Sequence, residues 1–169
     1  DKVLAVNGEI YNHLDLRKEF KNKYNFKTQS DCEVILALYT EYGSSFMNKL
    51  NGIFAFTLYD AVKDEYLVAR DHIGIVPLYL GWDKNNTLFV ASEMKALEDS
   101  CKRVEIFPPG HFLTNKSEKP QLWYKSNWNR ISFLKDRSAV KTNLKEALEK
   151  AVHRQLMTDV PYGVLLSGG

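Results

Sequence analysis

The chain has 169 residues, of which 44% are hydrophobic, 12% aromatic and 26% charged, and this composition favours a folded globular protein over a disordered one. Its 23 basic and 21 acidic residues give a formal net charge of +2, too balanced for nucleic acid to be the main partner. The sequence has no apolar run of membrane-spanning length and no signal-peptide pattern. We therefore expect neither a nucleic-acid-binding nor a membrane protein.

The two cysteines, Cys32 and Cys101, are too few for a disulfide framework and favour a reducing compartment, most simply the cytoplasm. The four histidines are scattered, and none stands beside other ligand residues at metal-binding spacing, so we predict no metal site. Cys32 is interpreted as a small apolar filler of a helix. Neither cysteine has a histidine base beside it, so neither is favoured as a nucleophile.

The first predicted elements are a strand over residues 2–6 and a helix over residues 12–23, N-capped by its first residue. Ser30 and Glu33 have the spacing of a capping box. Apolar residues behind them recur at helical spacing, which predicts a second helix over residues 30–41.

From residue 53 the hydrophobic period changes to two, which is typical of strands. Three hairpins are predicted, over residues 53–71, 77–93 and 111–125, and the first turns at residues 62–64. Arg70 and Asp71 end an apolar strand, and we interpret this pair as an anchor for the following loop rather than as catalytic residues.

Residues 126–137 show no clear period and are predicted to be a linker. A helix is predicted over residues 139–157, followed by a short strand over residues 164–166 that runs into Ser167-Gly168-Gly169. A helix followed by a strand and a glycine turn opens an α/β unit. The turn lacks the lysine of a Walker A motif, which argues against a P-loop kinase. The helix is amphipathic, with an apolar residue at every fourth position: Leu144, Leu148, Val152 and Leu156.

Two places near the N-terminus have both a structural and a chemical interpretation. Asn7-Gly8 is a common turn dipeptide, but an Asn amide and the next backbone N–H can also form an oxyanion hole, with Glu9 placed to receive a positive group. Asp31 either stabilises a helix N-terminus or binds a substrate ammonium. The residues alone leave both pairs of interpretations open, and the structural ones are the commoner.

Seven segments of the chain carry a family resemblance: VLAVNGEIYNH, SDCEVILALY, GIFAFTLYD, ARDHIGIVPLY, VASEMKAL, FPPGH and DVPYGVLLSGG. Together they resemble glutamine-dependent asparagine synthetase, in that family's order and over almost the whole chain. Several of them are shared more loosely by other amidotransferases with an N-terminal nucleophile, whereas the ending TDVPYGVLLSGG singles out asparagine synthetase. The resemblance implies an α+β fold, a four-layer αββα sandwich truncated at its N-terminus, followed by the start of an α/β ATP-pyrophosphatase domain.

The resemblance also implies the chemistry of the glutamine site. In the family an N-terminal cysteine attacks the glutamine amide, with its own α-amino group as base. Asn7 and Gly8 match the oxyanion-hole pair. Glu9 and Asp31 match the groups that hold the glutamine α-amino group and its surroundings.

A second site is implied for the other half of the reaction. Ammonia passes to a domain where ATP, with Mg²⁺, activates aspartate as β-aspartyl-AMP, and the products are asparagine, AMP and pyrophosphate. Ser167, Gly168 and Gly169 match the first half of that domain's pyrophosphate loop, and Leu165 and Leu166 match the strand end against which adenine lies. The family is often dimeric, so a homodimer is compatible with the resemblance.

The sequence departs from the family at both ends. It begins with Asp1 in mid-strand, without the N-terminal cysteine or the arginine-bearing segment upstream, and it ends within the glycine loop. We therefore expect a partial glutaminase domain (1–125), a linker (126–137) and the start of a synthetase domain (138–169), inactive alone but part of an active parent enzyme.

Two alternatives remain for the function. A β-lactam synthetase-like relative has the same two-domain plan and tends to lose the N-terminal cysteine while keeping the loop. A glutaminase-like module that only binds is a different class of protein. The presence of Asn7, Gly8, Glu9 and Asp31 together argues against the second alternative.

Overall fold

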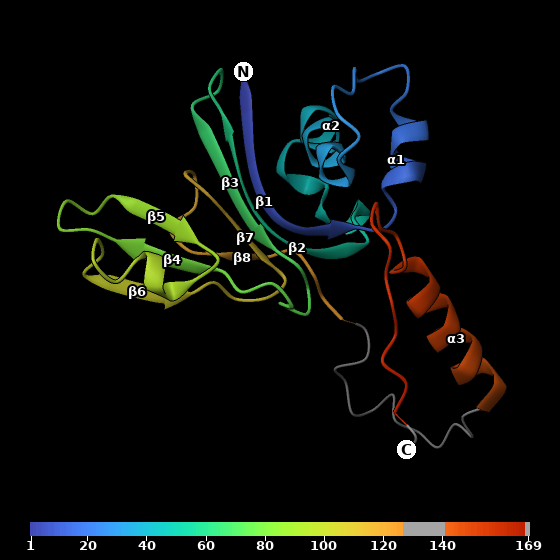
Figure 1. Ribbon diagram of the computed structural model, residues 1–169. Helices are drawn as coiled ribbons and strands as arrows, with labels where there is room; N and C mark the ends of the chain where they lie inside the picture. The colour runs from blue at the N-terminus through green and yellow to red at the C-terminus, as the bar shows by residue number, and fades with distance from the viewer. Residues whose placement is uncertain (127–140, 168–169) are drawn as a thin grey trace. The chain divides into compact units, whose positions relative to one another are not determined.

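The computed structural model describes residues 1–126 and 141–167, and the chain divides into two compact units, residues 1–126 and residues 127–169. The first unit contains two antiparallel sheets and two α-helices (Figure 1). The second unit contains the helix α3, Lys141–Arg154.

The larger sheet has five strands in the order β1-β2-β3-β7-β8, so β1 is an edge strand. The smaller sheet has the order β5-β4-β6. The pairings β1–β2, β2–β3, β4–β5 and β7–β8 are antiparallel, so the predicted run of antiparallel hairpins is confirmed. The strands are β1 Lys2–Ile10, β2 Gly52–Asp60, β3 Glu65–Arg70, β4 Tyr79–Trp82, β5 Leu88–Ala91, β6 Arg103–Ile106, β7 His111–Thr114 and β8 Gln121–Leu122.

The helices α1 (His13–Glu19) and α2 (Val34–Tyr42) cover one face of the larger sheet, and the smaller sheet lies on its other face (Figure 1). Within residues 1–126 these are the only α-helices, so this range supplies three of the four expected layers. Four short 3₁₀ turns complete the unit: η1 Asp31–Glu33, η2 Gly43–Ser45, η3 Met47–Lys49 and η4 Met94–Ala96.

The two-residue period of β2 explains why the sheet has a core on each face. Phe54, Phe56 and Leu58 point to the helices and are buried with the apolar faces of α1 and α2. Ala55 points the other way and is buried with residues of the smaller sheet, including Leu80. The larger sheet is therefore the middle layer that fixes the positions of both neighbours.

Three details near the N-terminus correct the predictions. β1 continues to Ile10 instead of ending at residue 6, because its ladder with β2 extends to the pair Ile10–Gly52. The first helix spans only residues 13–19. Asn12 is the N-cap residue of that helix, as predicted, but it makes no side-chain cap bond, since its side chain instead bonds to Lys49 O and Asn51 N.

The predicted capping box at Ser30 and Glu33 is wrong. Ser30 makes no side-chain cap bond, and the Glu33 carboxylate accepts hydrogen bonds from Lys27 and Thr28 instead. The predicted helix nevertheless exists, as η1 followed by α2, and ends at Gly43 with φ +60°. Strand β6 was not predicted, because it has only four residues and its charged and apolar side chains alternate too briefly to give a clear pattern.

At the other end, the predicted helix is confirmed over residues 141–154, while residues 139–140 and most of the predicted linker lie outside the described residues. The strand predicted over residues 164–166 is wrong, since these residues form no regular element and Leu165 is 101% exposed. A strand needs a hydrogen-bonded neighbour, and residues 141–167 provide none. No helix in the described part of the chain is both long and apolar enough to cross a bilayer.

Candidate functional site

The candidate site lies along the edge strand β1. Asn7 pairs with Ala55 and Gly8 with Phe54, so both residues lie inside a strand and the tight-turn interpretation is wrong. The side chains of Asn7 and Glu9 are exposed and alternate with those that point to the helical core. Asn7 also lines a cavity of about 170 Å³, together with residues of β2, residues of β5 and Leu78, which immediately precedes β4.

The register of β1 determines which backbone groups are free at this edge. Ladder bonds join Tyr11 to Asn51 at 2.7 Å and Ala61 to Asp1 at 3.0 Å. Because bonded and non-bonded pairs alternate in an antiparallel ladder, the even-numbered residues of β1 occupy the positions that do not bond to β2. Gly8 and Ile10 are therefore the residues whose backbone groups are available at the edge, beside the side chains of the odd-numbered residues.

Only glycine fits at position 8. Its φ is +141°, and a Cβ there would lie 2.1 Å from Ile53 O and 2.7 Å from the Cα of Phe54. The carbonyl oxygen of Gly8 lies 3.7 Å from the Cys32 sulfur, which packs against the edge from η1. At Gly8 the backbone of β1 therefore lies close to β2 on one side and to Cys32 on the other. This is the position predicted to supply an oxyanion-hole N–H.

Asp31 is brought to the same place by the tertiary fold. Its Oδ2 accepts the backbone N–H of Ile10 at 2.6 Å, across 21 residues of sequence. Within the described residues Oδ1 accepts no hydrogen bond, so it can accept from another donor. The four predicted binding residues of the first unit, Asn7, Gly8, Glu9 and Asp31, are thus brought together at one end of β1.

The pKa values of nearby groups report the charge of this region. Burial, then the charge and hydrogen bond of Asp31, then the charge of Glu9, raise the pKa of the Cys32 thiol to about 12. Burial and the charges of Glu9 and Asp71 raise the pKa of Tyr11. Two carboxylates therefore act on the same buried thiol, and their surroundings favour a positively charged ligand group. A buried, protonated thiol is a poor nucleophile, as the sequence indicated for Cys32.

The interpretation of Arg70 and Asp71 as a loop anchor is confirmed. The buried Arg70 guanidinium donates to the carbonyl oxygens of Val76, Phe107 and Gly74 at 2.7 to 2.8 Å. Asp71 Oδ1 accepts N–H groups of the same loop, and its Oδ2 accepts the N–H of Phe54 at 3.3 Å. Because Phe54 pairs with Gly8, the anchor also supports the strand that carries the site.

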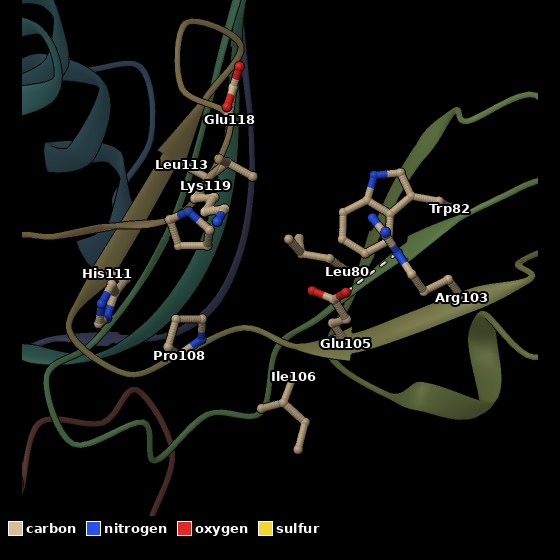
Figure 2. Close-up of a pocket in the computed structure, with 11 residues that line it drawn as sticks. Leu80, Trp82, Arg103, Glu105, Ile106, Pro108, His111, Leu113, Glu118 and Lys119 are labelled. Carbon is tan, nitrogen blue, oxygen red and sulfur yellow. Dashed lines mark ion pairs between the residues drawn. The ribbon is translucent and has the colours of Figure 1, made fainter.

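A separate cavity of about 550 Å³ opens between the walls formed by β4 with β6 and by β7 with its following loop (Figure 2). Leu80 and Leu113 contribute buried apolar surface to its lining. On one wall, Arg103 lies 3.9 Å over the ring of Trp82 and 3.4 Å from Glu105. This cavity shares no residue with the site on β1, and its charged side chains are exposed, so it is not the predicted glutamine site.

The predicted nucleotide residues belong to the second unit. Leu165, Leu166 and Ser167 are exposed in a segment without helix or strand, and Gly168 and Gly169 lie outside the described residues. In the described ranges 1–126 and 141–167, no group of three His, Cys, Asp or Glu side chains is placed to hold a metal ion.

The fold and the site define the class of protein. The sequence profile of the glutamine amidotransferase domain family matches residues 1–150, and the chain belongs to this family. The profile of asparagine synthase matches residues 143–169. A solved structure supports the fold: glutamine phosphoribosylpyrophosphate amidotransferase from B. subtilis, complexed with ADP and GMP, has a TM-score of 0.63 at 25% identity, over 74% of this chain and 30% of that one. The predicted α+β fold of amidotransferases with an N-terminal nucleophile is thus confirmed.

Curated relatives narrow the comparison to one kind of amidotransferase, as the sequence resemblance predicted. The chain is 53% identical to asparagine synthetase B [glutamine-hydrolyzing] of Escherichia coli K12 over 167 residues, which are 99% of this chain and 30% of the relative. It is 48% identical over 173 residues to a probable asparagine synthetase of Dictyostelium discoideum, and 46% identical over 167 residues to the nodule asparagine synthetase of Pisum sativum. In each case the match covers 99% of this chain but only 28 to 31% of the relative, so the chain spans less than a third of the length of these relatives.

Proposed function

We propose that this chain is the glutamine-binding part of a glutamine-hydrolysing asparagine synthetase. The observation that carries the proposal is the bond from Ile10 N–H to Asp31, which places that carboxylate beside the strand bearing Asn7, Gly8 and Glu9. The similarity to asparagine synthetases over 99% of the chain supports the choice among amidotransferases.

In this proposal the two carboxylates bind the α-ammonium group of glutamine and the edge of β1 binds its amide. Hydrolysis of an amide develops negative charge on the carbonyl oxygen, which the Asn7 side-chain amide and the Gly8 N–H stabilise. Losing one donor of such a pair costs about 10²–10³ in kcat. The positions of Glu9 and Asp31 on one side of these donors support an ammonium site, because opposite charge lowers the cost of desolvating the ligand.

The nucleophile in this proposal is an N-terminal cysteine of the whole protein, with its own α-amino group as base, as the resemblance implies. Its sulfur forms a thioester with the glutamine carbonyl, ammonia leaves with the proton, and water releases glutamate. Cys32 does not take this role, because burial first and the neighbouring carboxylates next hold its pKa at about 12.

The ammonia is proposed to reach a second domain that activates aspartate with ATP, which gives asparagine, AMP and pyrophosphate. We assign residues 1–125 to the glutaminase domain, residues 126–137 to a linker and residues 138–169 to the start of the second domain. There, Leu165 and Leu166 lie against adenine, and Ser167 with the two glycines after it begins the pyrophosphate loop. Mg²⁺ accompanies ATP and is not assigned to any residue of this chain.

A cytoplasmic location and a homodimer belong to the same proposal. Both Cys32 and Cys101 are free, which supports a reducing compartment. The substrates are the small molecules glutamine, aspartate and ATP, and the balanced charge of +2 gives no support to a nucleic-acid partner.

The test uses the full-length protein that contains this chain, supplied with aspartate, ATP and Mg²⁺ and with either glutamine or ammonia. We expect asparagine from both nitrogen sources. Asn7→Ala is expected to lose synthesis from glutamine and keep synthesis from ammonia, while Asn22→Ala, at an exposed position of the same unit, keeps both. A different product would identify a related synthetase, and binding of glutamine without glutamate release would identify a binding module.

A further inference from the structure

The loop that precedes Asp31 is held from one side by Arg17 of α1. The Arg17 Nη2 donates to the carbonyl oxygens of Thr28, at 3.0 Å, and Ser30, at 2.7 Å. Its guanidinium also lies 4.4 Å from the centre of the Phe26 ring. Only 17% of the Arg17 side chain is exposed, whereas the two carbonyl oxygens that it binds belong to exposed residues of the loop.

Glu33 holds the same loop from the other side. Its carboxylate accepts the N–H of Lys27 at 2.7 Å, the N–H of Thr28 at 2.8 Å and the Thr28 hydroxyl at 2.7 Å. The same carboxylate lies 3.6 Å from Arg17 Nη2, and 7% of the Glu33 side chain is exposed. Burial alone would raise the pKa of Glu33, but the bonds from Lys27 and Thr28 and the charge of Arg17 lower it overall.

Residues 27–30 have no helix or strand to fix their path. Arg17 and Glu33 bind the backbone at both ends of this short segment, and Asp31 follows it directly. Asp31 contacts Ile10 through one hydrogen bond of 2.6 Å, so a small shift of the segment moves the Asp31 carboxylate relative to β1. The orientation of this carboxylate therefore depends on Arg17 and Glu33.

We propose that Arg17, paired with Glu33, is a positioning residue for the glutamine site: it fixes the backbone of residues 28–30 so that the Asp31 carboxylate meets the end of β1. The inference rests on the proposed function, since it concerns the binding of glutamine at that site. Arg17 does not contact the ligand in this arrangement and acts only through Asp31.

The geometry calls for arginine rather than lysine. One Arg17 nitrogen serves two carbonyl oxygens and approaches the Glu33 carboxylate, while the flat guanidinium covers an aromatic ring. A lysine ammonium keeps the charge and can donate to oxygens, but it is a compact point charge on a flexible stem and lacks the flat guanidinium that covers the Phe26 ring. Arg17→Lys therefore separates the loss of geometry from the loss of charge.

The experiment measures glutamate release and asparagine synthesis by the full-length protein as functions of glutamine concentration. For Arg17→Lys and Arg17→Met we expect the KM for glutamine to rise about tenfold or more, which corresponds to about 1.4 kcal/mol of binding free energy, with a smaller change in kcat. Synthesis from ammonia should be unchanged. Lys18→Met is the matched control, because Lys18 is the next residue of α1, is 80% exposed and, among the described residues, forms an ion pair only with Asp15.

A double mutant separates positioning from a general loss of stability. If Arg17 acts through Asp31, Arg17→Lys should add little to the KM of an Asp31→Asn protein, because interacting residues are non-additive. An equal rise of KM in both backgrounds, or a lower melting temperature with an unchanged KM, would overturn the inference. Glutamate release by the wild-type protein is measured before any variant is compared. A wild-type protein that releases no glutamate would refute the proposed function itself.

Discussion

Asp31 accepts, at 2.6 Å, a backbone N–H that Ile10 does not use in the ladder with β2. The bond joins the first turn before α2 to the end of an edge strand. It satisfies a donor that would otherwise be unpaired next to a fully buried side chain, since Ile10 is 0% exposed. The Asp31 carboxylate thus has a structural partner through Oδ2, while its Oδ1 accepts no hydrogen bond from the part of the chain that the structure describes.

The first prediction separates these two roles of Asp31. Asp31→Asn keeps an acceptor for the Ile10 N–H, whereas Asp31→Ala leaves it unsatisfied. We expect the alanine variant to lose about 1–3 kcal/mol of unfolding free energy and the asparagine variant less. Both should weaken glutamine binding, because both remove the charge. Urea denaturation and calorimetric titration of glutamine measure the two effects, and equal destabilisation by both variants would contradict the structural role.

The second prediction concerns Gly8. A Cβ at this position would overlap Ile53 O at 2.1 Å, and the φ of +141° is strained for any other residue. Gly8→Ala should therefore cost about 3 kcal/mol or more of unfolding free energy. Gly43→Ala is the matched control, because Gly43 also has a positive φ, +60°, but an added Cβ meets nothing within 4 Å. Similar losses in the two variants would show that strain alone, and not the contact with β2, requires glycine.

The third prediction tests the loop anchor. Arg70→Met removes three donors and leaves the carbonyl oxygens of Val76, Phe107 and Gly74 without them. Each buried group left unsatisfied costs about 1–3 kcal/mol, so we expect a loss of at least about 3 kcal/mol. Lys84→Met, in an exposed turn, should change stability little. Chemical denaturation followed by tryptophan fluorescence measures both, and a loss below 1 kcal/mol for Arg70→Met, about the value of one ordinary hydrogen bond, would contradict the anchor.

The hairpins and the long helix were predictable because their signal is local. Alternation over residues 53–60 directly reflects the two cores on either side of β2. The strand predicted at residues 164–166 has the same apolar signal but no neighbour within residues 141–167, so local pattern alone misled the prediction. Pattern indicates what a segment can pair with, while the pairing itself depends on what lies beside it.

The candidate residues of the site could be proposed from the sequence, but their geometry could not. A tight turn was the commoner interpretation of Asn7 and Gly8 from the residues alone, yet the ladder with β2 runs through them to Ile10. The contribution of Arg17 gave no signal, because its bonds reach 11 and 13 residues along the chain to backbone carbonyls. Backbone acceptors look the same at every position of a sequence, so only the fold identifies them. The spacing of Ser30 and Glu33 did point to Glu33, although for a cap that does not form.

The fourth prediction concerns the buried thiol of Cys32. Its pKa is raised from an ordinary 9.0 to about 12, first by burial, then by the charge and hydrogen bond of Asp31 and the charge of Glu9. A thiol-specific reagent at about pH 9 should therefore modify Cys101, which is partly exposed, and spare Cys32 until the protein unfolds. Mass spectrometry of peptides from the native and the denatured protein distinguishes the two sites. Equal modification of both cysteines in the native protein would show that Cys32 is not shielded.

The same shift predicts how stability depends on pH. Because the folded state holds the proton more tightly than the unfolded state, the stabilisation is complete below pH 9.0 and is lost as the pH rises from 9.0 toward about 12. The unfolding free energy should fall by at most about 1.4 kcal/mol per pH unit in that range from this group. Cys32→Ala removes the titrating group and should flatten the curve, whereas Cys101→Ala should keep it. If the unfolding free energy of the Cys32→Ala protein falls with pH as steeply as that of the wild type, the alkaline loss of stability arises from other groups. Tyr11 and Tyr39, whose pKa values are also raised, are such groups.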